Sequence, residues 1–501
     1  MNYEQLEIWF VTGSMHLYGE ETLREVDAQS ATIVESLNRC GTLPFRVVYK
    51  GTACSSAEIA DKLGQANGSP QCVGVVTWMH TFSPAKMWIR GLRALQKPLL
   101  HLHTQFQREI PWADIDMDFM NLNQSAHGDR EFGHIVSRMR KPRKIVVGHW
   151  EDADVQQRIA VWMRVCAAWA DAQGMRVVRF GDNMNNVAVT DGDKVEAEIR
   201  FGYHVDYFSI GELAKIVVET ADREIDRLVE EYESQYVFAD DVKRGAAHHG
   251  QVREAARIEI ALRQFLDQTG AKAFTTSFDA LHGLNQLPGL ASQRLMNDGF
   301  GFGAEGDWKT AALVRTMKVM AHGLPGGTSF LEDYVNHFRG KGAVLQAHML
   351  EICPSISGEK PRMEVHPLSI GGKADPARLV FTACEGTGVA ATVVDMGNRF
   401  RMIVNLVDCI QPEAELPKLP VARAFWIPQP DLKISAHAWI LAGGTHHTSF
   451  SYALTSEYLE DFAEIAGIEM LRIDNATTIE SFKKDIRLNE IYYMLGKAVQ
   501  S

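Results

Sequence analysis

Acidic and histidine side chains in the C-terminal part of the chain are those best suited to chemistry. Glu305 follows a glycine-rich stretch, and Glu332 follows an apolar run. His348 lies within Gln-Ala-His-Met-Leu-Glu, and His446-His447 form a pair further on. Carboxylates and imidazoles together make the mixed oxygen and nitrogen set that a divalent ion such as Mn²⁺ accepts. These residues are therefore candidate ligands of a metal centre.

Each of these residues also has an ordinary interpretation. A single glutamate is usually a solvated charge, and a single histidine on a strand is usually a hydrogen-bonded core residue. The spacing along the chain matches no metal-binding signature. An all-cysteine zinc site is excluded, because the seven cysteines include no Cys-x-x-Cys pair.

The stretch Gly301-Phe-Gly-Ala-Glu-Gly306 fits the Gly-x-Gly-x-x-Gly pattern of dinucleotide sites. We predict that it binds no nucleotide, because a helix end rather than a strand is expected over 292–299. Glu305 would also lie where the phosphates bind and would repel them. We expect the glycines to permit a tight turn from which Glu305 projects.

Other candidate residues are assigned to structure rather than chemistry. Ser83-Pro84 should open a helix, with Lys86 beside it and Trp88 facing the core. His248-His249 is expected at the surface, and Cys166, beside two alanines, in the core. The chain has no Gly-x-Ser-x-Gly elbow and no phosphate-binding Gly-x-x-x-x-Gly-Lys loop.

Composition limits the class of protein. The chain has 501 residues, of which 46% are hydrophobic and 23% charged, which excludes disorder, collagen and coiled coil. The net charge of −12 argues against nucleic acid or an anionic membrane as the main partner. Neither a signal peptide nor an apolar stretch of membrane-spanning length is evident. We expect a cytoplasmic protein with free thiols.

Apolar runs and helical patterns alternate in the first two thirds, which predicts parallel α/β sheets. The expected N-terminal strands are 6–11, 46–49, 72–78 and 98–103, with helices over 20–38, 56–66 and 85–95. The polar stretch 105–140 is expected to be irregular. A second α/β block follows, and short apolar runs after residue 328 predict a β-rich sandwich or barrel with two closing helices. The predicted domains are 1–175, 176–326 and 327–501.

Long motifs throughout the chain resemble those of the L-arabinose isomerase family. They follow the same order from about residue 8 to residue 493, and they include GSMHLYGEETL, HTFSPAKMW, IDMDFMNLNQSAHGDREFG, LHGLNQLPGLA, AEGDWKTAAL, GGTSFLEDY, HMLEICPSI, IGGKADPARL and AWILAGGTHHT.

The resemblance implies two Rossmann- or flavodoxin-like α/β domains and a β-rich, barrel-like C-terminal domain, a fucose isomerase-like architecture. It implies a cytoplasmic homohexamer that interconverts L-arabinose and L-ribulose, the first step of L-arabinose catabolism, with one Mn²⁺ per subunit. A side activity on D-galactose, giving D-tagatose, is expected. The implied metal ligands are Glu305, Glu332, His348 and His447. The implied substrate contacts are Met15, Leu17, Phe82, His127, Met184, Phe278, Ile370 and His446.

One position departs from the family pattern. The family usually has Gln where this chain has Met15, within Gly13-Ser-Met-His-Leu-Tyr-Gly19. A thioether offers only a weak acceptor in place of an amide. The substitution therefore puts the sugar contact at this position in doubt and leaves the metal set unchanged.

The expected mechanism moves a proton between two neighbouring carbons of an open-chain sugar through a cis-enediol, with Glu305 and Glu332 as the acid–base pair. A metal-assisted hydride shift is the rival route. The alternative functions are an isomerase for another aldose such as D-galactose or L-fucose, a non-catalytic sugar-binding module, and a metal hydrolase. A pure binder has no use for two carboxylates and two imidazoles, and a hydrolase would cleave a bond.

Overall fold

The computed structural model describes residues 3–368 and 372–500, and the chain forms two compact units. The first contains residues 1–170 and 460–467, and the second contains 171–459 and 468–501. The predicted three-domain division stays a prediction. No described helix is both long and apolar enough to cross a membrane.

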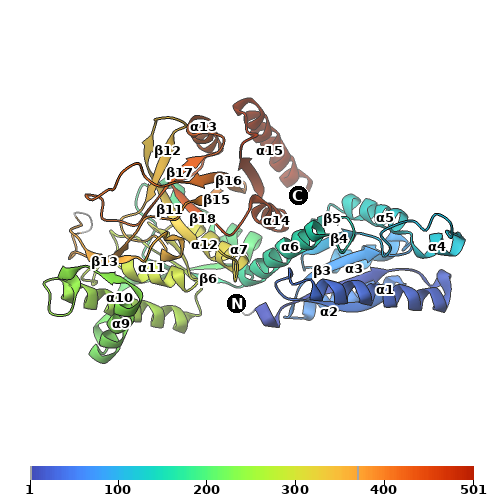
Figure 1. Cartoon of the computed structure of the whole chain (residues 1–501), viewed down its shortest axis with the longest axis horizontal. Coiled ribbons are helices and arrows are strands. Elements are labelled where there is room, and N and C mark those ends of the chain that lie inside the picture. The colour runs from blue at the N-terminus through green and yellow to red at the C-terminus, as the bar shows by residue number, and fades with distance from the viewer. Residues whose placement is uncertain (1–2, 369–371, 501) are drawn as a thin grey trace. The chain divides into compact units, whose positions relative to one another are not determined.

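The first unit is built on a parallel five-stranded sheet in the order β2-β1-β3-β4-β5 (Figure 1). This is the flavodoxin-like order, in which polar loops gather at the carboxyl edge. The strands are β1 (Glu7–Gly13), β2 (Arg46–Ala53), β3 (Cys72–Met79), β4 (Leu99–His103) and β5 (Lys144–Val147). The helices are α1 (Gly19–Arg39), α2 (Ser56–Gly68), α3 (Ile89–Ala94), α4 (Met117–Leu122), α5 (Ser125–Arg138), α6 (Ala153–Ala172) and part of α14 (Ser456–Ala466).

Strand and helix assignments from the sequence hold in this unit, with one exception. The stretch 105–140 is not irregular throughout, because it contains α4 and α5. The side chain of Asp116 accepts a hydrogen bond from the Phe119 amide and caps α4, while Phe132 and Val136 bury one face of α5. The apolar face was too sparse to show in the sequence. Trp88 and Cys166 are fully buried, as predicted.

The second unit begins with a parallel four-stranded sheet in the order β10-β9-β6-β7. Its strands are β6 (Arg176–Phe180), β7 (His204–Phe208), β9 (Ala273–Thr276) and β10 (Gly301–Ala304). Its helices are α7 (Lys194–Phe201), α8 (Ile210–Glu219), α9 (Asp222–Gln235), α10 (His249–Thr269), α11 (Gly289–Asn297) and α12 (Trp308–Met320). The two parallel sheets confirm the predicted α/β class.

The glycines of the 301–306 stretch have two different roles, which corrects part of the sequence prediction. Gly301 and Gly303 lie inside β10 and form no turn; a Cβ on them would approach the Ala311 and Asp307 carbonyl oxygens of α12 to 2.0 and 2.3 Å. They therefore let the helix pack directly on the strand. Only Gly306, with φ of +80°, makes the turn.

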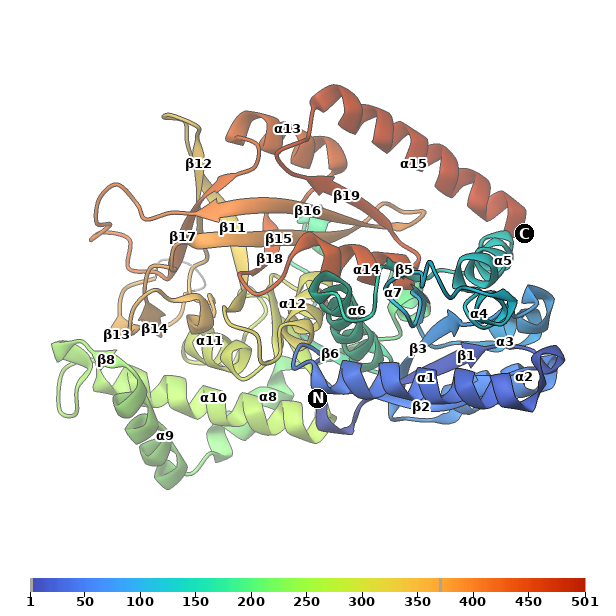
Figure 2. The same ribbon diagram turned by 45° about the vertical axis from the view of Figure 1, so that its right-hand side comes forward.

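The C-terminal region is a closed antiparallel barrel, as expected. Its strands follow the order β15-β18-β11-β12-β17-β16, and β16 pairs back with β15 (Figure 2). They are β11 (Thr328–His337), β12 (Ala343–Ala347), β15 (Gly386–Asp395), β16 (Phe400–Cys409), β17 (Arg423–Pro428) and β18 (His447–Ser451). Strand β19 (Glu469–Ile473) pairs in parallel with β16. Helices α13 (Leu432–Ala442) and α15 (Ile479–Gln500) pack beside β19. A small sheet of β8 (Val237–Phe238), β13 (Arg362–Val365) and β14 (Ala377–Val380) completes the unit.

Helix α12 joins the second sheet to the barrel. It is buried along almost its whole length and packs on β10 on one side and on β11 and β18 on the other. Side chains of β11 alternate, so Phe330 joins the core of the α/β part while Leu331 joins the barrel core. The face of β11 that carries Phe330 also carries Glu332. This packing places the end of β10 beside the outer face of the barrel.

Candidate metal centre

Glu305 lies in the turn between β10 and α12. Its backbone has φ of +57°, in the left-handed region that non-glycine residues rarely adopt. Its carbonyl accepts a hydrogen bond from the Met184 amide at 3.0 Å. A Cβ on Gly306 would lie 2.5 Å from the Asn183 Cα, so the turn requires glycine here. Such strain is typical of a residue held for a function.

Three barrel residues share one face beside this turn. Glu332 and His447 are direct partners in the antiparallel pairing of β11 with β18. His348 directly follows β12, whose Ala347 is the partner of Glu332 on the other side. Side chains opposite each other on neighbouring strands lie close together. The register therefore places Glu332 of β11 beside His447 at the start of β18 and beside the end of β12, which His348 follows.

The donor atoms of these side chains lie close enough together to bind one ion. His348 Nε2 lies 3.3 Å from Glu332 Oε2, and His447 Nε2 lies 3.8 Å from Glu305 Oε2. His446 Nε2 lies 3.6 Å from Glu305 Oε2. Two triads result, one of Glu305, His446 and His447 and one of Glu332, His348 and His447, each with donor atoms within 4.8 Å of one another.

The Nδ1 atom of each of the imidazoles of His447 and His348 contacts a carboxylate. His447 Nδ1 is 3.0 Å from Asp307 Oδ2, and His348 Nδ1 contacts Glu351 Oε2. A proton on each Nδ1 leaves the Nε2 lone pair free to bind an ion. Buried His447 Nε2 has no hydrogen-bond partner within residues 3–368 and 372–500. A metal ion would satisfy this nitrogen, so the residues present fit the implied ion.

The two glutamates have opposite electrostatic environments. The hydrogen bond with His446 is the main reason that the pKa of Glu305 lies below its usual value, although burial opposes the shift. At Glu332 burial is the largest influence and raises the pKa, although the neighbouring His348 acts to lower it. Burial also disfavours protonated His348, but Glu351 and Glu332 outweigh it and raise its pKa. Paired carboxylates with diverging pKa values are typical of acid–base sites.

Asp307 and Glu351 were given no role from the sequence. Asp307 is fully buried, and burial raises its pKa, but Lys309 and the hydrogen bond with His447 outweigh that and hold the pKa well below its usual value. The sequence carried a signal for each, because Asp307 lies two residues after Glu305 and Glu351 lies three after His348. The contact of Asp307 with His447 depends on the packing of α12 against β18, whereas Glu351 and His348 are neighbours in the sequence.

The other predicted substrate contacts of the second unit are His446, Met184, Phe278 and Ile370. His446 joins the cluster, and Met184 is tied to Glu305 through the backbone. Phe278 is half-buried and packs on the core of the α/β part. Ile370 lies outside the described residues.

The four predicted contacts of the first unit lie near the carboxyl edge of its sheet: Met15, Leu17 and Phe82 in the segments that follow β1 and β3, and His127 near the start of α5. The rings of Phe82 and His127 stack with centroids 4.5 Å apart. The hydroxyls of Ser14 and Thr81 are 2.7 Å apart and connect the loops that carry Met15 and Phe82. Met15 is half-buried and Leu17 is 83% exposed. The structure thus brings Phe82 and His127 together and leaves Leu17 exposed to solvent.

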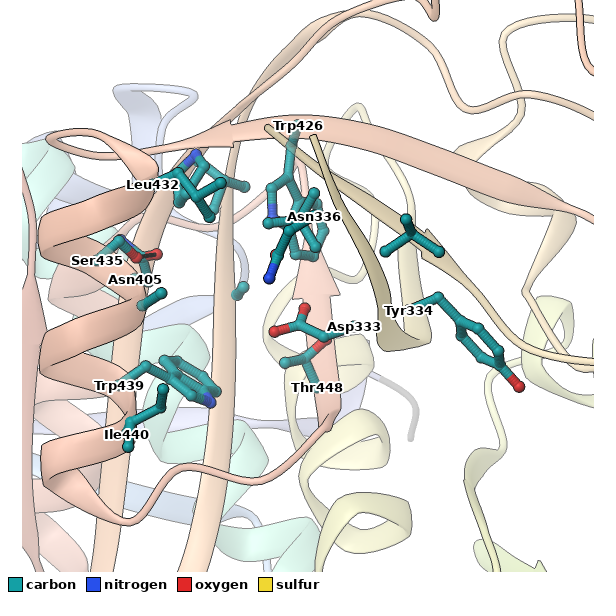
Figure 3. Close-up of a pocket in the computed structure, with 16 residues that line it drawn as sticks. Asp333, Tyr334, Asn336, Asn405, Trp426, Leu432, Ser435, Trp439, Ile440 and Thr448 are labelled. Carbon is teal, nitrogen blue, oxygen red and sulfur yellow. Dashed lines mark hydrogen bonds between the residues drawn. The ribbon is translucent and has the colours of Figure 1, made fainter. Parts of the chain in front are cut away.

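A separate cavity of about 180 Å³ opens inside the barrel. Figure 3 shows Asp333 and Asn336 of β11 projecting into it, while Tyr334 points away. Trp426, Trp439 and Thr448 also line it. Asp333 and Thr448 follow Glu332 and His447, so strand alternation turns them to the opposite face of the same two strands. The cavity is therefore distinct from the metal centre.

The comparisons with known proteins agree over the whole chain. Models described as the L-arabinose isomerase N-terminal, central and C-terminal domains match residues 2–174, 176–323 and 327–469. An L-arabinose isomerase of Herpetosiphon aurantiacus is 59% identical, with 100% of both chains covered. That of Phocaeicola vulgatus is 60% identical, with 99% of each covered, and that of Geobacillus kaustophilus is 56% identical, with 97% and 98% covered.

A solved structure of a periplasmic sugar-binding protein from Legionella pneumophila matches with a TM-score of 0.14 and 10% identity, over 63% of this chain and 95% of that one. A likeness this weak says nothing about fold or function.

Proposed function

The chain belongs to the L-arabinose isomerase family and is an isomerase, and we propose that it interconverts L-arabinose and L-ribulose at the Glu305, Glu332, His348 and His447 centre. The observation that carries this site is the pair of imidazoles whose Nδ1 atoms are tied to carboxylates while their Nε2 atoms face the two glutamates. Those four residues would hold one Mn²⁺, which suits their mixed oxygen and nitrogen donors.

When bound, the ion would supply Lewis-acid stabilisation of negative charge on the two sugar oxygens. The protein side chains supply the rest. Glu305 and Glu332 approach the site from different elements, the β10–α12 turn and β11. We propose that one takes the proton from C2 of the aldose while O1 gains a proton, giving a cis-enediol. The other then returns a proton to C1 as the O2 hydroxyl gives up its proton to form the ketose carbonyl. His446 is placed to hold Glu305 in position, since its Nε2 lies 3.6 Å away.

The loops of the first unit are proposed to provide the sugar specificity. Met15, Leu17 and Phe82 lie on segments that follow strands at one sheet edge, His127 lies near the start of α5, and Leu17 is 83% exposed. A sugar site needs walls on several sides. We propose a homohexamer in which these loops of one subunit complete the metal centre of a neighbour. Cytoplasmic location and a side activity on D-galactose belong to the same proposal.

Incubation of the pure protein and Mn²⁺ with a panel of pentoses and hexoses tests the activity. Ketose formation from L-arabinose, with a smaller rate on D-galactose, is the expected result. A preference for another aldose would move the assignment to a related isomerase, and binding without turnover would indicate a sugar-binding module. Cleavage into fragments whose combined mass exceeds that of the substrate by one water would reveal a hydrolase.

Transfer of solvent deuterium into the sugar separates the two chemical routes. The enediol predicts exchange at the carbon that receives the proton, because the carboxylic acid equilibrates with water. Turnover without any exchange would favour the hydride shift. Light scattering gives the assembly state, and a fully active monomer would contradict the shared site.

A further inference from the structure

A second group of metal-binding side chains lies in the first unit, apart from the centre described above. It consists of His16, Cys54 and Glu58, whose ligand atoms all lie within 4.8 Å of one another. His16 and Glu58 have side chains that are 68% and 43% exposed, whereas Cys54 is 8% exposed. The group thus has a buried sulfur at its base and an opening toward solvent.

The local fold fixes two of the three ligands. Cys54 directly follows β2, and Glu58 lies in the first turn of α2. One carboxylate oxygen, Glu58 Oε2, accepts the Cys54 amide at 2.7 Å, while the Ser55 hydroxyl accepts the Glu58 amide. Ser55 thus caps α2, and the hydrogen bond from the Cys54 amide holds the Glu58 carboxylate near the cysteine. The other oxygen, Oε1, is left facing His16 Nε2 at 3.5 Å.

The ordinary explanation of this arrangement covers only part of it. Capping accounts for Glu58, and an exposed His–Glu contact contributes little to stability. Neither accounts for a thiol whose sulfur lies within 4.8 Å of a Glu58 carboxylate oxygen and of a His16 ring nitrogen. Ligands bound to one tetrahedral zinc ion lie about 3.3–3.8 Å apart, given bonds of about 2.0–2.3 Å. The His16–Glu58 distance already falls in that range, and small side-chain rotations would bring Cys54 Sγ into it.

We propose that His16, Cys54 and Glu58 form a binding site for a soft or borderline divalent ion such as Zn²⁺ or Cd²⁺, with water at the fourth position. The thiolate sets this preference, because sulfur selects these ions over Mn²⁺. The site is thus chemically distinct from the oxygen- and nitrogen-donor centre of the second unit. Metal binding at this site does not depend on the proposed isomerase activity.

Titration of the full-length protein with Cd²⁺ tests the site directly. The metal is first removed by chelation, and the metal centre is then saturated with Mn²⁺. Cd²⁺ bound to a thiolate gives an ultraviolet sulfur-to-metal charge-transfer band, which is independent of turnover. We expect this band to saturate at one Cd²⁺ per chain.

Variants identify the side chains that give rise to the charge-transfer band. Cys54→Ser should abolish it, while Cys40→Ser, a partly exposed cysteine of the same unit, should leave it unchanged. Glu332→Gln should also keep it, which separates this site from the metal centre. His16→Gln and Glu58→Gln should each weaken binding about tenfold or more, since each removes one ligand. In the Glu58→Gln variant the side-chain amide oxygen can still accept the Cys54 amide, so the helix cap survives.

Two outcomes would overturn the proposal. One is the absence of a band from the wild-type protein at excess Cd²⁺. The other is an undiminished band in Cys54→Ser, which would assign the signal to other cysteines. If Cys54→Ser does not fold, as judged by thermal unfolding, the two surface variants decide, and unchanged Cd²⁺ affinity in both would refute the site.

Discussion

The metal centre of the second unit and the loop edge of the first differ in how firmly their side chains are held. His447 is fully buried, and its ring is fixed through Asp307. Leu17 is 83% exposed, and the short helix that carries it begins at Met15 without a side-chain cap. The proposed chemistry is therefore built on rigid strands, while the proposed specificity lies on more exposed segments.

Removal of the metal should have the largest effect. Exhaustive chelation should abolish turnover, because the two imidazoles and two glutamates alone cannot stabilise charge on the sugar oxygens, and Mn²⁺ should restore it. Turnover and metal content are measured on the same sample. Full activity at negligible metal content would show that the Glu305, Glu332, His348 and His447 cluster is not a metal centre.

Loss of either carboxylate should come next. Glu305→Gln and Glu332→Gln keep the side-chain shape and remove a charged ligand and a base, so kcat should fall about 10²–10⁴-fold. Glu364→Gln is the matched control, because Glu364 also contacts a histidine, His366 at 2.7 Å, outside the site. Near-normal kcat in both site variants would remove the acid–base assignment.

Weakening the support behind the imidazoles should have a smaller effect. Glu351→Gln should lower Mn²⁺ affinity about 10–100-fold, because the His348 ring loses its charged anchor. Asp307→Asn should do the same at His447 and should also lower the thermal stability, since it leaves Lys309 buried with an uncompensated charge. Mn²⁺ affinity and Tm are measured together. Unchanged affinity in both variants would show that the rings need no anchor.

Met15→Gln should have the smallest effect, since it changes the open loop alone. The amide can pair with a sugar hydroxyl that the thioether leaves unpaired, a difference of about 1 kcal/mol or more. KM for L-arabinose should therefore fall about tenfold, and discrimination against D-galactose should rise. The measurement is kcat/KM on both sugars. Indistinguishable values would mean that water or a neighbouring side chain already replaces the contact.

Much of the architecture was predictable from local patterns. The alternation of apolar runs with helical stretches predicted both parallel sheets, and the short apolar runs after residue 328 predicted the barrel. The helices α4 and α5 were missed because their apolar faces are narrow. Gly301 and Gly303 were misinterpreted because a glycine needed for close packing looks the same in sequence as one needed for a turn.

The sequence by itself determined which side chains were available and which family motifs they belong to. Glu305, Glu332, His348 and His447 were identified from residue type and resemblance alone. Only the tertiary structure decided how they meet: α12 brings the β10 turn against β11 and β18, and the strand register sets Glu332 opposite His447. It also decided that Asp307 and Glu351 fix the imidazoles. The Glu351–His348 contact lies within three residues, but the Asp307–His447 contact and the meeting of the four candidate ligands depend on register and helix packing, which join residues distant in sequence and leave no local pattern along the chain.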